Sequence, residues 1–437
     1  MAVAARIGRS EHSIPIDPRK TRWVLLGICI VAAALRVVAF VVFDRFNHPD
    51  VWENDTVARN LLEGKGFTYS FLGTVYRSYM EPLYPVLCAL VYRVTGYSSH
   101  ALALVHVLLG TLLVWLVFQC GRALASERVG LLAAGFTALH PGLIVYTTKF
   151  HPFILDSLLF VAVLAACLAC HGQRAGWSSL RLGLVTGVCV LTRPTIVASL
   201  PLIAWWLWRQ VNRSMRRWIR VGGVWAVTVL AVIGPWVWRN YQIHHRLILT
   251  RSGTSMVLWI GNNPYGFTGS ALTADGRPLL IDVLPPAAQR EVLMLDELGQ
   301  QDWFLRQARD FIAADPVGAI RRWVVKWWYF WWFSPQAGLL YPPTAFRLYQ
   351  GWYLMLLGLA VRGVWRLWQT ARVGGERPHT GWWLVLGICL ATALVQSLFY
   401  VEGRHRLLLE PFLALLASQG LFFRRERGVQ IGGAHAP

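Results

Sequence analysis

The sequence has little charge and, above all, little acid. Only 15% of its 437 residues are charged, and 22 Asp and Glu stand against 42 Lys and Arg. A soluble domain needs more polar surface than this. With 55% hydrophobic residues and a mean hydropathy of +0.44, the composition predicts an all-α polytopic membrane protein. The apolar runs are continuous rather than alternating, which excludes a closed β-barrel.

Paired cysteines and internal repeats are also lacking. All seven Cys residues fall in apolar segments, where they behave as small hydrophobic side chains, so a disulfide framework is excluded. The absence of a repeat argues against the transporter folds that are built from repeated halves. The net charge of +20 is explained by Lys and Arg that collect in cytoplasmic loops, so we expect no nucleic acid among the partners.

About ten transmembrane helices are expected, with both termini in the cytoplasm. The segment 1–22 is basic, which places the N-terminus inside. Residues 82–97 and 320–333 are too short to span, and we expect them to form interfacial helices on the outer face. The expected spans, set by the thickness of the hydrocarbon layer, are 23–43, 99–121, 129–148 with a kink at Pro141, 153–170, two short arms within 181–209 that meet near Arg193, 221–238, 346–368, 381–400 and 405–423.

This topology divides the chain into five parts. They are a cytoplasmic segment (1–22), a transmembrane module (23–238) that includes the first external loop (45–98), a long external loop with short helices (239–345), the C-terminal transmembrane helices (346–423) and a cytoplasmic tail (424–437).

Charged residues gather on the external side of this topology. Asp50, Glu53 and Asp55 follow the first span within six residues, in a chain that is poor in acid. Ionisable groups near the hydrocarbon are costly, so their clustering on one face indicates a site. A carboxylate there can deprotonate an acceptor hydroxyl while cations hold a lipid phosphate as it leaves. The polar residues that the topology adds to this face are Arg77, Lys149, His151, Arg193, Arg404 and Arg406.

Several motifs follow one another in a recognisable order. After the acid come Ala58-Arg-Asn-Leu-Leu-x-Gly-x-Gly-Phe67, Pro82-Leu-Tyr-Pro85, Leu191-Thr-Arg-Pro194, Arg239-Asn-Tyr241, Gly261-Asn-Asn-Pro264 and Gly403-Arg-His-Arg406. Together they resemble the GT-C superfamily of membrane glycosyltransferases. The resemblance is to the bacterial branch near the protein O-mannosyltransferases and the lipid A aminoarabinose transferase, which is glycosyltransferase family 39-like.

The resemblance implies an inverting transfer of a sugar from a polyprenyl-phosphate donor to an acceptor hydroxyl on the periplasmic face. The family's catalytic acid falls on Asp50, and Glu53 and Asp55 are close enough to be rivals. The residues expected to bind the donor phosphate are Arg77, Lys149, Arg404 and His405, and those expected to bind substrate are His151, Arg193, Asn262 and Asn263.

No cofactor is expected, and a divalent cation is the alternative. No metal ligand is assigned, because His151 stands where the family often has an acid that could bind a metal ion. The expected partners are a polyprenyl-phosphate sugar, an acceptor glycan, lipid or protein, and membrane lipids. The expected location is the bacterial inner membrane. Two other functions stay open: a transporter or flippase of a lipid-linked sugar, and a non-catalytic subunit of an envelope-polysaccharide assembly system, which would tolerate Asp50→Asn.

Overall fold

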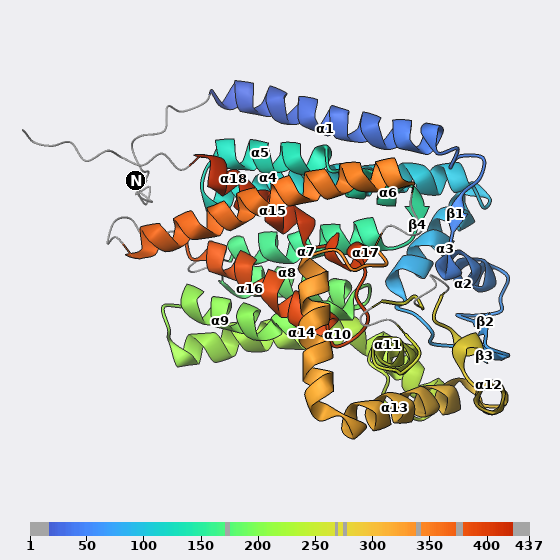
Figure 1. The fold of residues 1–437 in the computed structure, drawn as a ribbon. Helices are drawn as coiled ribbons and strands as arrows, with labels where there is room; N and C mark the ends of the chain where they lie inside the picture. The colour runs from blue at the N-terminus through green and yellow to red at the C-terminus, as the bar shows by residue number, and fades with distance from the viewer. Residues whose placement is uncertain are drawn as a thin grey trace, which may run out of the picture.

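The computed structural model describes residues 17–170, 175–266, 270–273, 278–337, 342–372 and 379–422. The expected tail 424–437 and most of the segment 1–22 lie outside the described residues. Within the described ranges the chain is helical, with two small sheets of two strands each, as the composition predicted. Figure 1 shows long helices lying side by side as a bundle, with the short strands gathered at one end.

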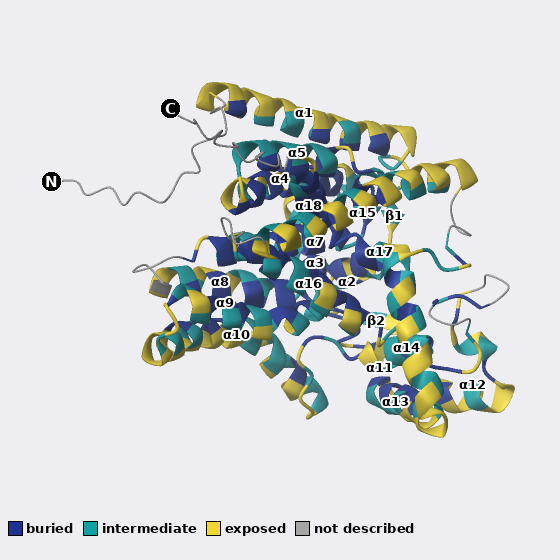
Figure 2. Ribbon diagram, turned by 60° about the vertical axis from the view of Figure 1, so that its left-hand side comes forward, coloured by how far each residue is buried: buried dark blue, intermediate teal, exposed yellow. Residues whose placement is uncertain are grey.

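The bundle is built around one large apolar core, in which side chains such as Phe160, Leu384 and Phe412 are fully buried. Figure 2 shows that α1 lies at the edge of the bundle and is largely exposed. The helices of the bundle are α1 (Pro18–Val42), α4 (Ser99–Leu124), α5 (Glu127–Ala138), α6 (Pro141–Thr147), α7 (Phe153–Leu168), α8 (Ala175–Val190), α9 (Leu200–Gln210), α10 (Met215–His244), α15 (Pro343–Arg372), α16 (Gly381–Gln396) and α18 (Glu410–Phe422).

Among the described residues, three helices are long and apolar enough to cross a membrane, namely α1, α4 and α10. The consecutive helices α5 and α6 make a fourth if they are taken together, with a bend of 55° between them. The bend lies at Pro141, where a kink was expected because proline lacks the N–H that a continuous helix needs. The count of ten spans is not confirmed, because α7 and α16 have 16 residues each and α9 has 11, against about 20 for a full crossing.

Two other expected spans are interrupted in the structure. The segment 405–423 is not one helix: α17 (Gly403–Arg406) ends in a turn, and α18 begins at Glu410. Pro411 explains the restart, because proline fits the first turn of a helix but not its interior. The segment 181–209 is interrupted near Arg193, as expected, and a 3-10 helix, η2 (Pro194–Ser199), leads into α9.

A second layer covers the end of the bundle where the strands lie, and it has its own apolar core around Tyr76, Trp259 and Phe304. In Figure 1 α14 stands across the long helices; it contains the expected interfacial segment 320–333 except for its last two residues. The elements at this end are β1 (Asp50–Val51), α2 (Glu53–Leu62), β2 (Tyr69–Phe71), β3 (Thr74–Tyr76), α3 (Leu83–Thr95), β4 (Lys149–Phe150), α11 (Thr254–Gly261), η3 (Ile281–Val283), α12 (Pro286–Leu293), α13 (Glu297–Ala314) and α14 (Pro316–Trp331).

Candidate active site

Two short strands that are remote in sequence bring Asp50 to Lys149. β1 and β4 pair in parallel, with Asp50 opposite Lys149. The Lys149 ammonium donates to Oδ2 of Asp50 at 2.8 Å, Arg45 lies 3.5 Å from the same oxygen, and the Trp52 indole N–H donates to Oδ1 at 3.0 Å. Burial alone would raise the pKa of Asp50, but Lys149, Trp52 and Arg45 outweigh it and lower that pKa below its ordinary value. Asp50 is therefore an ionised carboxylate near neutral pH.

Trp52 lies between this ion pair and a second cation. The Arg404 guanidinium is 5.5 Å from the centre of the Trp52 ring, and the Lys149 ammonium is 6.0 Å from it. The His151 ring meets the indole edge-on at 4.8 Å. Cations near an aromatic face are attracted by the ring's quadrupole, so Trp52 helps to hold two like charges near one another.

Arg404 is supported by its own segment. Its Nε lies 2.7 Å from Oε2 of Glu402, and its NH2 donates to the Tyr400 hydroxyl at 3.2 Å. Burial acts to lower the pKa of Arg404, but Tyr400 and Glu402 raise it overall. The guanidinium therefore stays charged and suits a phosphate.

His405 contributes a hydrogen-bond donor rather than a charge. The backbone N–H of Glu402 donates to Nδ1 of His405 at 3.1 Å, which places the proton of the neutral ring on Nε2. Burial, followed by the charges of Arg193 and Arg404, holds the pKa of His405 well below its ordinary value. A neutral ring can still donate Nε2–H to a phosphate oxygen.

Arg193 comes to the same region from the break after α8. Its NH1 lies 3.9 Å from Oδ2 of Asp156, a residue of the first turn of α7 that is only 1% exposed. Burial and then the charges of Arg404 and Arg193 depress the pKa of His151, so this ring is neutral as well. Both oxygens of Asp156, Nε of Arg193 and Nδ1 of His151 lack a hydrogen-bond partner among the described residues. Such unpartnered buried atoms indicate a place that water or a ligand fills.

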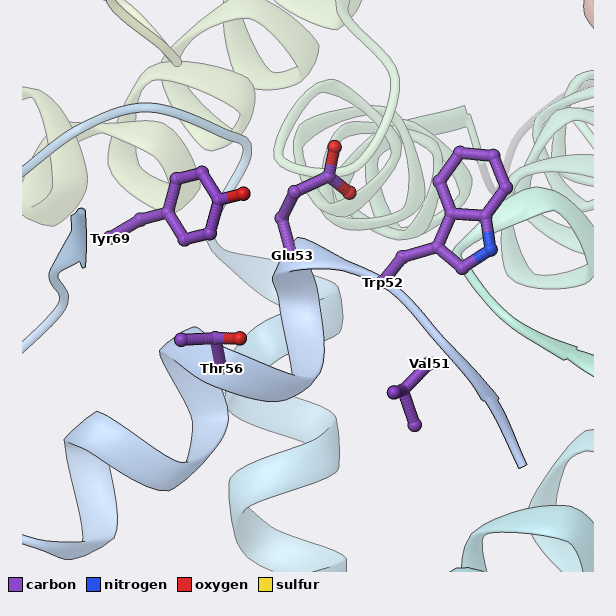
Figure 3. A pocket seen from close by; sticks show the side chains of 5 residues that line it. All are labelled: Val51, Trp52, Glu53, Thr56 and Tyr69. Atoms are coloured by element: carbon purple, nitrogen blue, oxygen red, sulfur yellow. The ribbon is translucent and has the colours of Figure 1, made fainter. Parts of the chain in front are cut away.

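Glu53 lies on the other side of Trp52. A pocket of about 400 Å³ is lined by Val51, Trp52, Glu53, Thr56 and Tyr69. Figure 3 shows the Glu53 carboxylate between the Trp52 indole and the Tyr69 ring, whose hydroxyl points toward it. Within the described part of the chain the Glu53 carboxylate makes no hydrogen bond or ion pair. The carboxylate is accessible to a molecule in the pocket, so Glu53 stays a candidate for the catalytic base.

Asp55 faces away from this cluster. Arg59 donates to its Oδ2 at 2.7 Å and the Tyr92 hydroxyl donates to its Oδ1 at 2.5 Å. Both oxygens are thus occupied, and the contacts fasten α2 to α3. The hypothesis that Asp55 is the catalytic base stays untested, but the geometry favours a structural role.

The contacts of Arg77 lie with α10 and α13 rather than with Asp50. Its backbone N–H donates to Oε2 of Glu297 at 2.6 Å, and Arg239 donates to its carbonyl oxygen at 2.7 Å. Its side chain is exposed. The structure therefore does not bring Arg77 together with Lys149 and Arg404, and its expected role at the donor phosphate stays a prediction.

Asn262 and Asn263 are buried in a turn. Asn262 donates to the carbonyl oxygens of Leu258 and Leu398 at 2.9 and 2.8 Å. Asn263 accepts from the backbone N–H groups of Tyr265 and Gly266, both at 2.8 Å. These contacts shape the turn and leave the two amides few free atoms, so substrate binding by them is not supported by geometry.

The structure adds residues that the sequence did not single out. Trp52 is one of 23 Trp, so composition gave no reason to choose it. Asp156 carried a usable signal, because it is the only acid in the apolar segment 153–168, and an acid inside a membrane segment is a site hypothesis by default. In the described ranges no three His, Cys, Asp or Glu side chains form a group that could hold a metal ion. The expectation that no cofactor is needed stays a prediction.

Comparison with known proteins gives a family match over part of the chain. Residues 80–238 match the family of dolichyl-phosphate-mannose-protein mannosyltransferases. A comparison with curated proteins finds no match.

Solved structures share the fold at low sequence identity. The oligosaccharyltransferase AglB of Archaeoglobus fulgidus, in complex with an inhibitory peptide and a dolichol-phosphate, superposes with a TM-score of 0.53 and 13% identity, over 92% of this chain and 50% of that one. The apo form of the Archaeoglobus fulgidus oligosaccharyltransferase gives 0.55 and 14%, with the same coverage. ArnT of Cupriavidus metallidurans bound to undecaprenyl phosphate gives 0.44 and 15%, over 92% of this chain and 78% of that one.

This chain spans about half the length of the oligosaccharyltransferases that it matches. The shared fold and the family match over residues 80–238 are in line with the resemblance that the motifs carry.

Proposed function

We propose that this protein is a membrane glycosyltransferase that moves a sugar, with inversion, from a polyprenyl-phosphate donor to an acceptor hydroxyl at the external face. One observation carries the proposal: the ionised Asp50 lies beside a group of cations that Lys149, Arg193 and Arg404 bring from separate loops. The family matched by residues 80–238 acts on a dolichyl-phosphate sugar, and the AglB structure holds a dolichol-phosphate; both support a lipid-phosphate donor here.

The chemistry follows from this arrangement. Asp50 takes the proton of the acceptor hydroxyl as the acceptor oxygen attacks the anomeric carbon. The bond from that carbon to the phosphate oxygen breaks with its electron pair, and the leaving lipid phosphate gains negative charge. Lys149 and Arg404 stabilise that charge, and Nε2–H of His405 donates to a phosphate oxygen. Attack from the face opposite the phosphate inverts the anomeric carbon.

The decisive experiment is sugar transfer in membranes supplied with a mixed pool of radiolabelled polyprenyl-phosphate sugars and candidate acceptors. We expect Asp50→Asn to abolish transfer at equal expression, because an amide cannot accept the proton. Glu53→Gln tests the rival base in the pocket. Asp302→Asn is the matched control, since Asp302 is an exposed acid paired with Arg246, remote from the site.

Each result points to one function. Loss of transfer in Glu53→Gln with transfer retained in Asp50→Asn would move the base to Glu53. No transfer by the wild type, with lipid-linked sugar translocated equally by wild type and Asp50→Asn, would favour a flippase. Added EDTA in the same assay tests the expectation that no divalent cation is required.

The proposed setting is the bacterial inner membrane with the site outside and both termini inside. Replacement of exposed His48, in the turn before β1, by Cys gives a probe for the proposed external face. Asn212, exposed between α9 and α10, gives the matched probe for the proposed cytoplasmic face. A membrane-impermeant maleimide should label His48→Cys but not Asn212→Cys in intact cells, and the reverse pattern would overturn the orientation.

A further inference from the structure

The segment 398–406 carries Glu402, Arg404 and His405, yet its only regular structure is the four-residue helix α17. A segment with so few internal hydrogen bonds does not by itself hold a guanidinium and an imidazole in fixed positions. In the structure this segment is held at both ends by buried cations, and both cations connect it to α14.

The first anchor is Lys326, in the middle of α14. Lys326 is 1% exposed, and its ammonium donates to three oxygens: the Gly261 carbonyl at 3.1 Å, Oδ1 of Asn262 at 3.1 Å and the Leu398 carbonyl at 3.2 Å. Asn262 also donates to the Leu398 carbonyl at 2.8 Å. In its charged form the ammonium uses all three protons in these bonds. Burial, followed by the charge of Arg322, lowers the pKa of Lys326 to about 7, so this charge is held at a cost. These bonds pin the start of the segment to α14 and to the turn after α11.

The second anchor is Arg406, at the other end of the segment, which is fully buried. Its NH1 donates to the carbonyl oxygens of Phe330 and Trp332, at the C-terminal end of α14, at 3.0 and 3.1 Å. Its Nε donates to Oε1 of Glu410 at 3.2 Å, and its NH2 donates to the Tyr349 hydroxyl at 3.0 Å.

Glu410 is itself held from the bundle. Nε2 of His140 lies 2.7 Å from its Oε2, and the Tyr349 hydroxyl donates to its Oε1 at 2.7 Å. Nδ1 of His140 accepts the N–H of Leu143 at 3.3 Å, which leaves Nε2 for the contact with Glu410. The second anchor thus joins α14, α15, α18 and the kink between α5 and α6.

A buried cation is a costly way to hold two pieces of chain together. Desolvation of a charge opposes folding, and apolar side chains of similar size usually give equal or greater stability. Two such cations at the two ends of one segment therefore point to a need for a defined geometry rather than for stability alone.

We propose that Lys326 and the Arg406–Glu410 pair are positioning residues. Their contacts with α14 hold the segment 398–406 in place, so that Arg404 and His405 are oriented toward the donor phosphate. The proposal rests on the function proposed above, because it takes that phosphate as the ligand. It assigns the outer layer a task in donor binding: α14 links the turn after α11 to the cation-bearing segment.

The test compares Lys326→Met and Glu410→Gln with the wild type in lipid nanodiscs. Lys326→Met keeps the length of the side chain and removes its donors. Gln300→Met is the matched control, since Gln300 is a buried residue of α13 that donates to three carbonyl oxygens but does not touch the segment. Lys326→Arg, which keeps donors at this position, tests rescue. Two quantities are measured: amide hydrogen exchange of a peptide covering 398–406, and affinity for undecaprenyl phosphate.

We expect both anchor variants to exchange faster in 398–406 and to bind undecaprenyl phosphate about tenfold more weakly, the equivalent of one charge-assisted hydrogen bond. Gln300→Met should match the wild type in both quantities, and Lys326→Arg should recover part of the affinity. Unchanged exchange in Lys326→Met would overturn the anchoring. Faster exchange with unchanged affinity would overturn the positioning role.

The failure of the proposed function gives a different result. If the wild type itself does not bind undecaprenyl phosphate, the donor class is wrong, whatever the exchange shows. If Lys326→Met does not fold, Asn262→Ala weakens the same anchor from the other side, and the same two measurements decide.

Discussion

The ammonium nitrogen of Lys149 lies 2.8 Å from Oδ2 of Asp50, and the backbones of the two residues pair directly although they are 99 positions apart. Two residues of pairing between β1 and β4 are enough to set this contact. The pair makes the basicity of Asp50 depend on Lys149: burial disfavours the charged carboxylate, and the ammonium restores it.

Lys149→Met should therefore move the acidic limb of the pH–rate profile to higher pH. Removal of the ammonium leaves burial, which raises the pKa of Asp50, opposed only by Trp52 and Arg45. In the wild type Asp50 stays ionised at a pH below the ordinary carboxyl pKa, so the acidic limb of its profile lies at a lower pH than that of Lys149→Met. The measurement is kcat against pH. Lys65→Met, which breaks the exposed Lys65–Glu63 pair, is the control, and an unmoved limb in Lys149→Met would contradict the assignment of Asp50 as the base.

Asp55→Asn should destabilise the protein without removing catalysis from the folded fraction. The substitution weakens two hydrogen bonds to a charged group, from Arg59 and Tyr92, at about 1.5–3 kcal/mol for a charged partner. We expect a lower melting temperature in detergent and a near-normal rate for each folded molecule. Tyr92→Phe should reproduce part of the loss of stability. A variant that melts like the wild type but does not turn over would instead make Asp55 the base.

Arg193→Gln should cost more stability than the double variant Arg193→Gln/Asp156→Asn. At about pH 9, where Asp156 is ionised despite its burial, the single change leaves the buried carboxylate without its counter-charge, a loss on the order of 3 kcal/mol. The double change removes the charge as well, so part of the stability should return. A double-mutant cycle on thermal unfolding measures the coupling. Additive losses would show that the pair at 3.9 Å does not interact.

The sequence predicted part of the group of residues that the structure brings together. The topology inferred from positive charge and span parity placed Asp50, Lys149, His151, Arg193, Arg404 and His405 on one face. In the structure these residues lie in one region. Arg77 was expected there for the same reason but contacts α10 and α13. Topology assigns a side of the membrane; it does not say which loops touch.

The count of spans shows a second limit. Hydropathy detects apolar stretches, but it does not show where a helix breaks. Pro411 accounts for the restart of α18, but the inward turn of Arg406 before it is held by contacts at the end of α14, with residues 76 and 74 positions away. Asn262 was chosen from a motif as a substrate ligand, and its neighbours Lys326 and Leu398 give it a structural role. A motif alone does not distinguish a residue that binds the substrate from a residue that supports the binding site.

Gly261→Ala tests that support directly. A Cβ added at Gly261 would lie 2.4 Å from the carbonyl carbon of Phe399 and 2.6 Å from its oxygen, which are backbone atoms and cannot rotate away. The turn and the segment 398–406 must then separate, and we expect a loss of about 1–3 kcal/mol, as for other overpacked sites. Gly135→Ala in α5 is the control, since nothing lies within 4 Å of its added Cβ and alanine favours a helix. Gly261 contacts the backbone of the segment before Arg404 and His405 and does not contact these two side chains. Binding of undecaprenyl phosphate is measured at a temperature where Gly261→Ala is fully folded, and weaker binding would show that the donor site depends on this backbone contact. Equal binding by the two glycine variants would show that it does not.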